Sequence, residues 1–320
     1  MNVMLETPVE SLDPQQATDG TSFEVIADYT DGLMQMDADG QAVPAIAESY
    51  DLSDDGLTYT FHLRTDAKWS NGTPVTAADF VFGWQRAVDP DVASEYAYML
   101  SDIGQIKNAA EIIAGEKDKS ELGVTAVDDN TLQVELNVPV SYFTSLMYFP
   151  TFYPVNEEFF TSCGDTFATS PETVLSNGAF VLDSYQPAAT AFHLTKNADY
   201  YDTDRVKLSG LSYQVIQDSQ QALMSYQTGA LDTTLVNGEQ VDQVSLKSAV
   251  FFSSIIVFNS SGVSDSSTIV YVRSLTFVSF VCSILHPLIS PAISRLIPHI
   301  FTRYFRNMFH YTCPQFSLLS

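Results

Sequence analysis

The sequence has few basic residues and few cysteines. Its 320 residues include 14 Lys and Arg against 39 Asp and Glu, a formal net charge of −25. Because nucleic acids and anionic membranes bind basic patches, this balance argues against a nucleic-acid or membrane-surface partner. The three cysteines, Cys163, Cys282 and Cys313, match no CxxC or zinc-binding spacing and indicate no disulfide framework. Cys163 is expected to be a packed thiol.

Catalytic and metal-binding motifs are also lacking. The sequence contains no HExxH, GxSxG or GxxxxGK[ST] motif, and no GxGxxG after a predicted strand. An EF-hand loop with Gly56 at its sixth position would need Glu at the twelfth, where His62 stands. His62 and His193 are each predicted to lie on the polar face of a strand. We therefore expect no metal, no cofactor and no enzymatic activity.

The most regular stretch runs from Asp55 to Arg86. Tyr59, Phe61 and Leu63 alternate with polar residues, a pattern typical of a half-buried strand. After a turn, Thr76 and Asp79 have the spacing of a capping box. A helix is then predicted from the apolar residues that recur at helical spacing: Ala77, Phe80, Val81, Trp84 and Val88. Asp89 should end this helix because it precedes a proline.

Other segments predict an alternation of helices and strands. A helix capped by Thr21 should end with Gly32 in a left-handed conformation. A hairpin is expected over residues 123–136, strands over 177–182 and 208–216, and a helix after Asp218. The aromatic residues of 142–160 have two interpretations, ligand stacking or core packing, and core packing is favoured.

The 55–86 stretch resembles a signature of the solute-binding proteins that serve oligopeptide and dipeptide ABC importers. In that family a DG-T-[YW]-T-F-x-L-R strand precedes K-W-S-x-G-x-P-[VF]-T-A-x-D-F-x-x-[SG]-x-x-R. Further passages match in the same order: Leu12-Asp13-Pro14, Asp31-Gly32, Pro44-Ala45-Ile46-Ala47-Glu48-Ser49 and Lys196-Asn197-Ala198-Asp199-Tyr200-Tyr201. The resemblance covers residues 1–246. It implies an α/β, type II periplasmic-binding-protein-like fold, with a discontinuous lobe (1–44 with 175–246) and an inserted α/β subdomain (45–174).

The resemblance also implies a function. A non-enzymatic monomer of this family captures extracytoplasmic oligopeptides and delivers them to the permease subunits of the importer. Carried over residue by residue, Asp31 would bind a ligand amine, and Tyr96 and Asn237 would bind the peptide backbone. Each has a structural alternative: a helix-end acid, a core-edge aromatic and a turn residue. Two rival functions stay open, a receptor-type binder of a signalling peptide or nickel complex, and a peptidase or other hydrolase.

The composition changes near residue 247. Residues 1–247 hold 38 acidic and 10 basic residues, whereas 248–320 hold one acid and four Arg. We expect residues 248–320 to be a non-family tail, frameshifted or disordered, and the family's second large lobe to be missing. The apolar run 275–285 is too short to span a bilayer. No secretory signal is visible at the start, although family members carry one, often with a lipid anchor, so the start is expected to be clipped or misannotated.

Overall fold

The computed structural model describes residues 1–37, 39–240, 255–257 and 270–272. These residues fall into two compact units. The first unit consists of Met1 and Thr7–Val215, and the second consists of Asn2–Glu6 and the residues from Ile216 onward. Residues 241–246 of the predicted lobe and almost all of the predicted 248–320 tail lie outside the described residues. Both predicted subdomains contribute to the first unit, and their boundaries remain a prediction.

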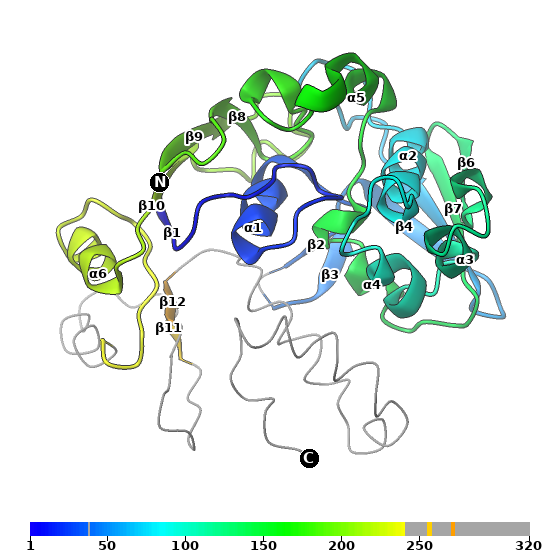
Figure 1. Cartoon of the computed structure of the whole chain (residues 1–320), viewed down its shortest axis with the longest axis horizontal. Coiled ribbons are helices and arrows are strands. Elements are labelled where there is room, and N and C mark those ends of the chain that lie inside the picture. Colours follow the sequence, from blue (N-terminus) through cyan, green and yellow to red (C-terminus); the bar gives the residue numbers. More distant parts are fainter. Residues whose placement is uncertain (38, 241–254, 258–269, 273–320) are drawn as a thin grey trace. The chain divides into compact units, whose positions relative to one another are not determined.

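An antiparallel sheet in the order β4-β5-β7-β6 forms one part of the first unit (Figure 1). Its strands are β4 (Ala47–Leu52), β5 (Thr58–Leu63), β6 (Val124–Asp128) and β7 (Thr131–Glu135). The predicted alternation of β5 is confirmed, because Tyr59, Phe61 and Leu63 are buried while the residues between them are half-buried. Phe61 pairs with Leu132 in β7, so the expected hairpin β6–β7 extends the same apolar face.

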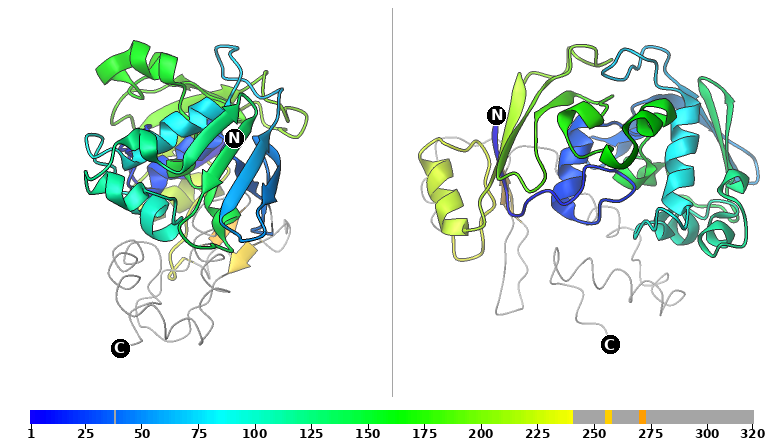
Figure 2. Two further views of the ribbon diagram at one scale, coloured as in Figure 1. Left: turned by 90° about the vertical axis from the view of Figure 1, so that its right-hand side faces the viewer. Right: turned by 45° about the horizontal axis from the view of Figure 1, so that its top comes forward.

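Helix α2 (Ala77–Val88) covers the apolar face of this sheet (Figure 2). The predicted capping box is confirmed, since Thr76 and Asp79 satisfy each other's backbone N–H groups. The helix ends at Asp89, before Pro90, as expected. Phe80 and Trp84 are completely buried. The position of the helix therefore follows from its apolar stripe and its two ends.

A second group of antiparallel strands belongs to the same unit: β8 (Phe180–Ser184), β9 (Ala191–Lys196) and β10 (Gly210–Val215). These strands confirm the strands expected in this region. Helix α1 (Gly20–Tyr29) contacts β8. The predicted N-cap of this helix is wrong, because Asp19 and not Thr21 accepts the hydrogen bond from the Ser22 N–H.

The predicted role of Gly32 is also wrong. Helix α1 already ends at Tyr29, its C-cap Thr30 is extended, and Gly32 is absent from the glycines with positive φ. A Cβ at this position would lie 2.2 Å from the carbonyl oxygen of Met147 and 2.9 Å from the ring of Tyr153. Gly32 is thus required by a close approach between two segments and not by its backbone conformation.

Shorter elements connect these layers. Strands β2 (Met34–Met36) and β3 (Ala42–Pro44) form a hairpin. The remaining short helices are α3 (Ala109–Ile113), α4 (Phe143–Leu146), α5 (Glu157–Cys163), a π-helix (Met99–Ile103) and 3-10 helices at Lys119–Glu121, Pro150–Phe152, Gly164–Thr166 and Pro171–Thr173. Five of the aromatics in 142–160 are buried, which confirms core packing: Phe143, Tyr148, Phe149, Phe152 and Tyr153.

The three remaining predictions about single side chains have mixed outcomes. His62 and His193 lie on the polar sides of β5 and β9, as predicted, and both are half-buried. His62 contacts the exposed Asp51 carboxylate at 2.7 Å. Cys163 is half-buried at the end of α5 and is therefore less packed than expected.

The second unit contains β1 (Asn2–Leu5), α6 (Ser219–Gln227) and an antiparallel pair of short strands, β11 (Ile255–Val257) with β12 (Val270–Val272). Its small core includes Met4, Ala222 and Leu231. The N-cap of α6 is Asp218, whose carboxylate accepts from the Gln221 N–H, as predicted.

Candidate functional site

Tyr96, one of the predicted ligand contacts, lies in an aromatic cluster of the first unit. Its ring meets Phe23 of α1 edge to face, with centroids 5.1 Å apart, and stacks on Phe149 at 5.5 Å. Tyr98 adds a fourth ring at 5.6 Å from Tyr96. Phe23 and Phe149 are buried, whereas Tyr96 is half-buried. Three segments that are distant in sequence therefore hold the Tyr96 ring in one orientation.

The Tyr96 hydroxyl is uncharged and is able to form hydrogen bonds with a ligand. Burial raises the pKa of Tyr96 to about 12, and the charges of Asp19 and Glu95 add to this. Within residues 1–37 and 39–240, the hydroxyl forms no hydrogen bond. A neutral phenol can donate one hydrogen bond and accept others. Tyr96 is therefore suited to bind a polar group such as a peptide carbonyl.

Asp31 follows helix α1, is half-buried and forms hydrogen bonds with three side chains. Its Oδ2 atom accepts hydrogen bonds from the hydroxyls of Tyr200 and Tyr201, both at 2.7 Å. Its N–H donates to Oδ1 of Asn177 at 2.7 Å, and Nδ2 of Asn177 donates back to its carbonyl. Burial raises the pKa of Asp31, while the two tyrosine hydroxyls and the charge of Arg64 lower it.

Arg64 completes the surroundings of Asp31. Its guanidinium carbon lies 3.6 Å from the centroid of the Tyr201 ring, a cation–π contact. The same guanidinium binds the Asp66 carboxylate at 2.6 and 3.2 Å. Arg64 directly follows β5, and Tyr201 follows β9, so this contact joins the ends of two strands from different sheets.

Asn237, the third predicted site residue, belongs to the second unit. Its Oδ1 atom accepts from the N–H of Gln240 at 3.1 Å, and its Nδ2 donates to Oγ of Ser219 at 3.3 Å. The Gln240 side chain in turn accepts from the Asn237 N–H. These bonds fit the turn role that was the structural alternative for this residue.

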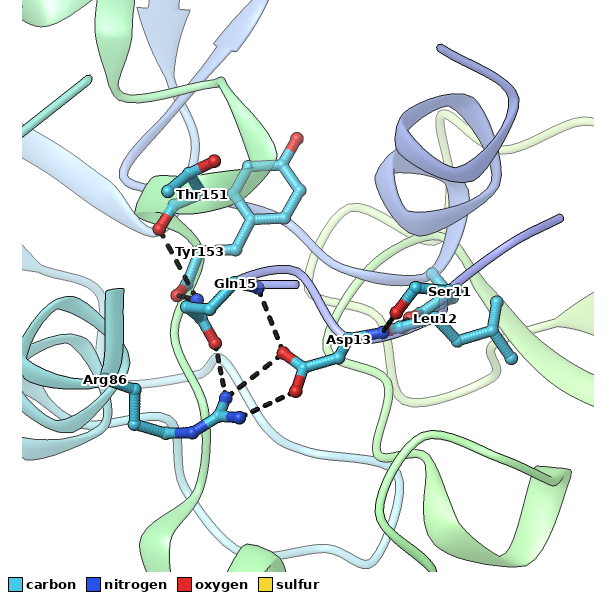
Figure 3. Close-up of polar contacts among 8 residues, drawn as sticks. Ser11, Leu12, Asp13, Gln15, Arg86, Thr151 and Tyr153 are labelled. Atoms are coloured by element: carbon cyan, nitrogen blue, oxygen red, sulfur yellow. Dashed lines mark hydrogen bonds and ion pairs between the residues drawn. The ribbon is translucent and has the colours of Figure 1, made fainter. Parts of the chain in front are cut away.

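A buried ion pair that the sequence did not predict lies between α2 and the Leu12-Asp13-Pro14 passage (Figure 3). Nη2 of Arg86 contacts Oδ2 of Asp13 at 2.6 Å, and Nη1 contacts Oδ1 of Asp13 at 3.2 Å and Oε1 of Gln15 at 2.7 Å. Nε2 of Gln15 donates to the carbonyls of Thr151 and Tyr153. This network connects the N-terminal segment, helix α2 and the 150–153 segment.

The sequence did contain one signal for this pair. Asp13 and Arg86 both belong to passages on which the family resemblance rests, yet neither lies in an apolar stripe. The structure buries both, with side-chain exposures of 8% and 6%. A charged side chain is rarely buried unless it is paired with an opposite charge, so burial of Asp13 and Arg86 requires the ion pair. Which two residues form the pair can be identified only when the fold is known.

Comparison with known proteins identifies the family. The sequence model described as bacterial extracellular solute-binding proteins, family 5 (middle), matches residues 41–271. The chain belongs to this family. The probable deoxycholate-binding periplasmic protein of Escherichia coli is 41% identical over 73% of this chain and 43% of its own length. Other curated relatives are matched over about two fifths of their length, so the chain spans less than half of these proteins.

Solved structures show the same fold. The structure of Listeria monocytogenes OppA bound to peptide has a TM-score of 0.73 and 40% identity, covering 77% of this chain and 48% of that one. The pheromone receptor PrgZ, described with its mode of peptide binding, has a TM-score of 0.74 and 34% identity, covering 80% of this chain and 50% of that one. The type II periplasmic-binding-protein-like fold expected from the sequence is thus confirmed for the part that aligns.

The signature residues of the solute-binding family have a structural role in this chain. Nε1 of Trp69 donates to Oδ2 of Asp79 at 3.1 Å, and Nδ2 of Asn156 donates to Oδ1 of Asp79 at 3.1 Å. Trp69 and Asp79 are buried, as is Arg86. The signature that revealed the solute-binding family therefore builds the scaffold, and the Tyr96 cluster is built by other residues.

Two features are absent from the described residues. No group of three or more His, Cys, Asp or Glu side chains there is arranged to hold a metal ion. None of the helices in that part of the chain has the length and apolar character needed to cross a bilayer.

Proposed function

We propose that this chain forms part of the substrate-binding component of a peptide ABC importer. In this role it captures oligopeptides outside the cytoplasm, as a monomer of a normally lipid-anchored protein, and presents them to the permease subunits. The observation that carries the proposal is the 40% identity and TM-score of 0.73 to a family member whose structure is described as bound to peptide.

The Tyr96 cluster supports a peptide as the ligand. A half-buried phenol with an unused hydroxyl matches a peptide N–H or C=O, and the half-buried ring of Tyr98 lies beside it. The buried rings of Phe23 and Phe149 support the Tyr96 ring from inside the protein. Peptide recognition in an extended form depends on backbone hydrogen bonds of this kind. Asp31 and Asn237 remain candidate ligand contacts, although their side chains already have partners within the protein.

Four alternatives follow from the relatives and the sequence. The similarity to a pheromone receptor favours a signalling peptide as one variant of the same function. The similarity to a probable deoxycholate-binding protein favours a bile acid. The net charge of −25 argues against an anionic ligand such as a bile acid, since like charges disfavour association. Binding of a nickel complex and peptide hydrolysis are the remaining alternatives.

The test is a thermal-shift and calorimetric titration of the full chain with tri-alanine, mixed di- to hexapeptides, deoxycholate and a nickel chelate. Peptide at about 100 times its Kd should stabilise the protein by about 2.7 kcal/mol. Mass spectrometry should recover the peptides intact, as expected of a non-enzymatic binder. A response to deoxycholate or nickel alone, cleavage of the peptides, or no response to any peptide would contradict the proposal.

Substitution of Tyr96 locates the site. Tyr96→Phe removes one hydroxyl and leaves the ring contacts in place, so peptide affinity should fall about two- to tenfold while thermal stability is unchanged. Tyr142→Phe is the matched control, because its hydroxyl donates to the Ile103 carbonyl, outside the cluster.

A further inference from the structure

One oxygen of the Asp31 carboxylate, Oδ2, already has two partners from the same chain. Tyr200 and Tyr201 both donate to this atom at 2.7 Å, and a ligand amine that approached Oδ2 would have to compete with these two hydroxyls. The main chain of Asp31 is fixed as well, through the two hydrogen bonds with Asn177. These contacts leave Asp31 with the features of an internal anchor.

Arg64 strengthens this anchor through the Tyr201 ring. A guanidinium that lies 3.6 Å from the ring centroid draws electron density from the phenol, which makes its O–H a better hydrogen-bond donor. Arg64 is held in place by Asp66 and by the Ala45 carbonyl. The Arg64 guanidinium thus contacts the Tyr201 ring, and the Tyr201 hydroxyl contacts the Asp31 carboxylate. We call Arg64, Tyr200, Tyr201 and Asp31 the Asp31 clamp.

The clamp joins two parts of the first unit. Arg64 follows β5 of the β4-β5-β7-β6 sheet, and the tyrosines follow β9 of the β8–β10 strands. On the predicted domain organisation these ends belong to the inserted subdomain and to the discontinuous lobe. The Tyr96 cluster spans the same division, since Phe23 and Tyr96 come from opposite sides of it.

We propose that Asp31 is a positioning residue, which acts through Tyr200 and Tyr201 to fix the orientation of the two sheets and hence of the Tyr96 cluster. The predicted effect of Asp31 on ligand binding rests on the proposed function. The coupling within the clamp is a property of the protein without ligand.

The first test is a double-substitution cycle in the full chain with Asp31→Asn, Tyr201→Phe and both together. Because Asp31→Asn already removes the carboxylate that Tyr201 contacts, the double variant should unfold at nearly the same urea concentration as Asp31→Asn alone. Amide exchange in residues 58–66 and 197–203 should become about two- to tenfold faster, as expected when one hydrogen bond is lost. Independent, additive losses of stability would overturn the proposal.

The second test separates positioning from direct ligand contact. If Asp31 acts through the tyrosines, Tyr201→Phe should weaken tri-alanine binding as much as Asp31→Asn does. If Asp31 touches the ligand, Tyr201→Phe should preserve or improve affinity, and this result would overturn the proposal. Should the unaltered chain bind no tri-alanine, the proposed function fails, and the urea and exchange measurements still decide the clamp.

A spectroscopic measurement observes the coupling at the tyrosines themselves. Burial and the charge of Asp31 raise the pKa of Tyr201 and of Tyr200 above the usual value for tyrosine. In an ultraviolet titration, Asp31→Asn should therefore lower the pH at which these tyrosines ionise. Tyr142→Phe serves as the control variant for all three measurements. An unchanged tyrosine titration in Asp31→Asn would contradict the coupling.

Discussion

Replacement of Arg86 by Met should destabilise the protein strongly. The change removes the two contacts with Asp13 and the contact with Gln15, and it leaves a carboxylate that is 8% exposed without its cation. Removal of one partner of a buried pair typically costs about 3–5 kcal/mol, because the remaining charge stays desolvated. Met fills a similar volume, so the loss reflects charge and hydrogen bonding more than packing.

The matched control is an exposed ion pair of the same first unit. Arg205 and Asp202 lie 3.8 Å apart with side-chain exposures of 58% and 38%. Loss of an exposed pair costs about 0–1 kcal/mol. For a unit of this size, 1 kcal/mol corresponds to about 2–4 °C in Tm. Arg86→Met should thus lower Tm by about 6–20 °C, and Arg205→Met by at most about 4 °C.

Circular dichroism melts and urea titrations at neutral pH provide the assay for this pair. In the variant with both Arg86→Met and Asp13→Leu, part of the lost stability should return, because no unpaired charge remains buried. A stabilising role of the buried pair is contradicted if Arg86→Met costs no more than Arg205→Met, or if the double variant is less stable than Arg86→Met alone.

Two further predictions concern packing and pH. Gly32→Ala should cost several kcal/mol in a urea titration, since the added Cβ would lie 2.2 Å from a carbonyl oxygen, whereas Gly20→Ala, where a Cβ meets nothing within 4 Å, should be nearly neutral. Burial raises the pKa of Glu24 to about 8, helped by the charge of Asp28, and burial raises the pKa of Asp28 to about 7 against a hydrogen bond from Tyr213. Because the folded state binds these protons more tightly, stability should fall as pH rises from about 4 to about 8, and Glu24→Gln should flatten this slope. Equal costs at the two glycines, or a slope that Glu24→Gln leaves unchanged, would contradict these predictions.

Local signals in the sequence predicted most of the elements. Alternation predicted β5, and the Thr76–Asp79 spacing predicted the start of α2, because both patterns act over a few neighbouring residues. The predicted N-cap of α1 was wrong, since Asp19 and Thr21 are both good N-cap residues and only the folded geometry selects Asp19. Boundaries depend on small energy differences that tertiary packing can reverse.

Contacts between distant segments could not be predicted in the same way. The prediction for Gly32 failed because a glycine after a helix usually marks a left-handed cap, whereas here it admits the carbonyl of Met147. The Asp31 clamp joins residues more than a hundred positions apart. No local pattern records such pairs, and only the family resemblance indicated that these passages belong together.

On the proposed function, the signature residues build the scaffold and the half-buried Tyr96 of the aromatic cluster faces the ligand. A photoreactive peptide, a short alanine peptide with one benzophenone side chain, tests this directly when its cross-links to the chain are mapped by mass spectrometry. We predict cross-links within residues 93–100 and around Phe149, reduced by excess tri-alanine. Cross-links concentrated on the buried 68–86 signature stretch, or insensitive to unlabelled peptide, would contradict the claim.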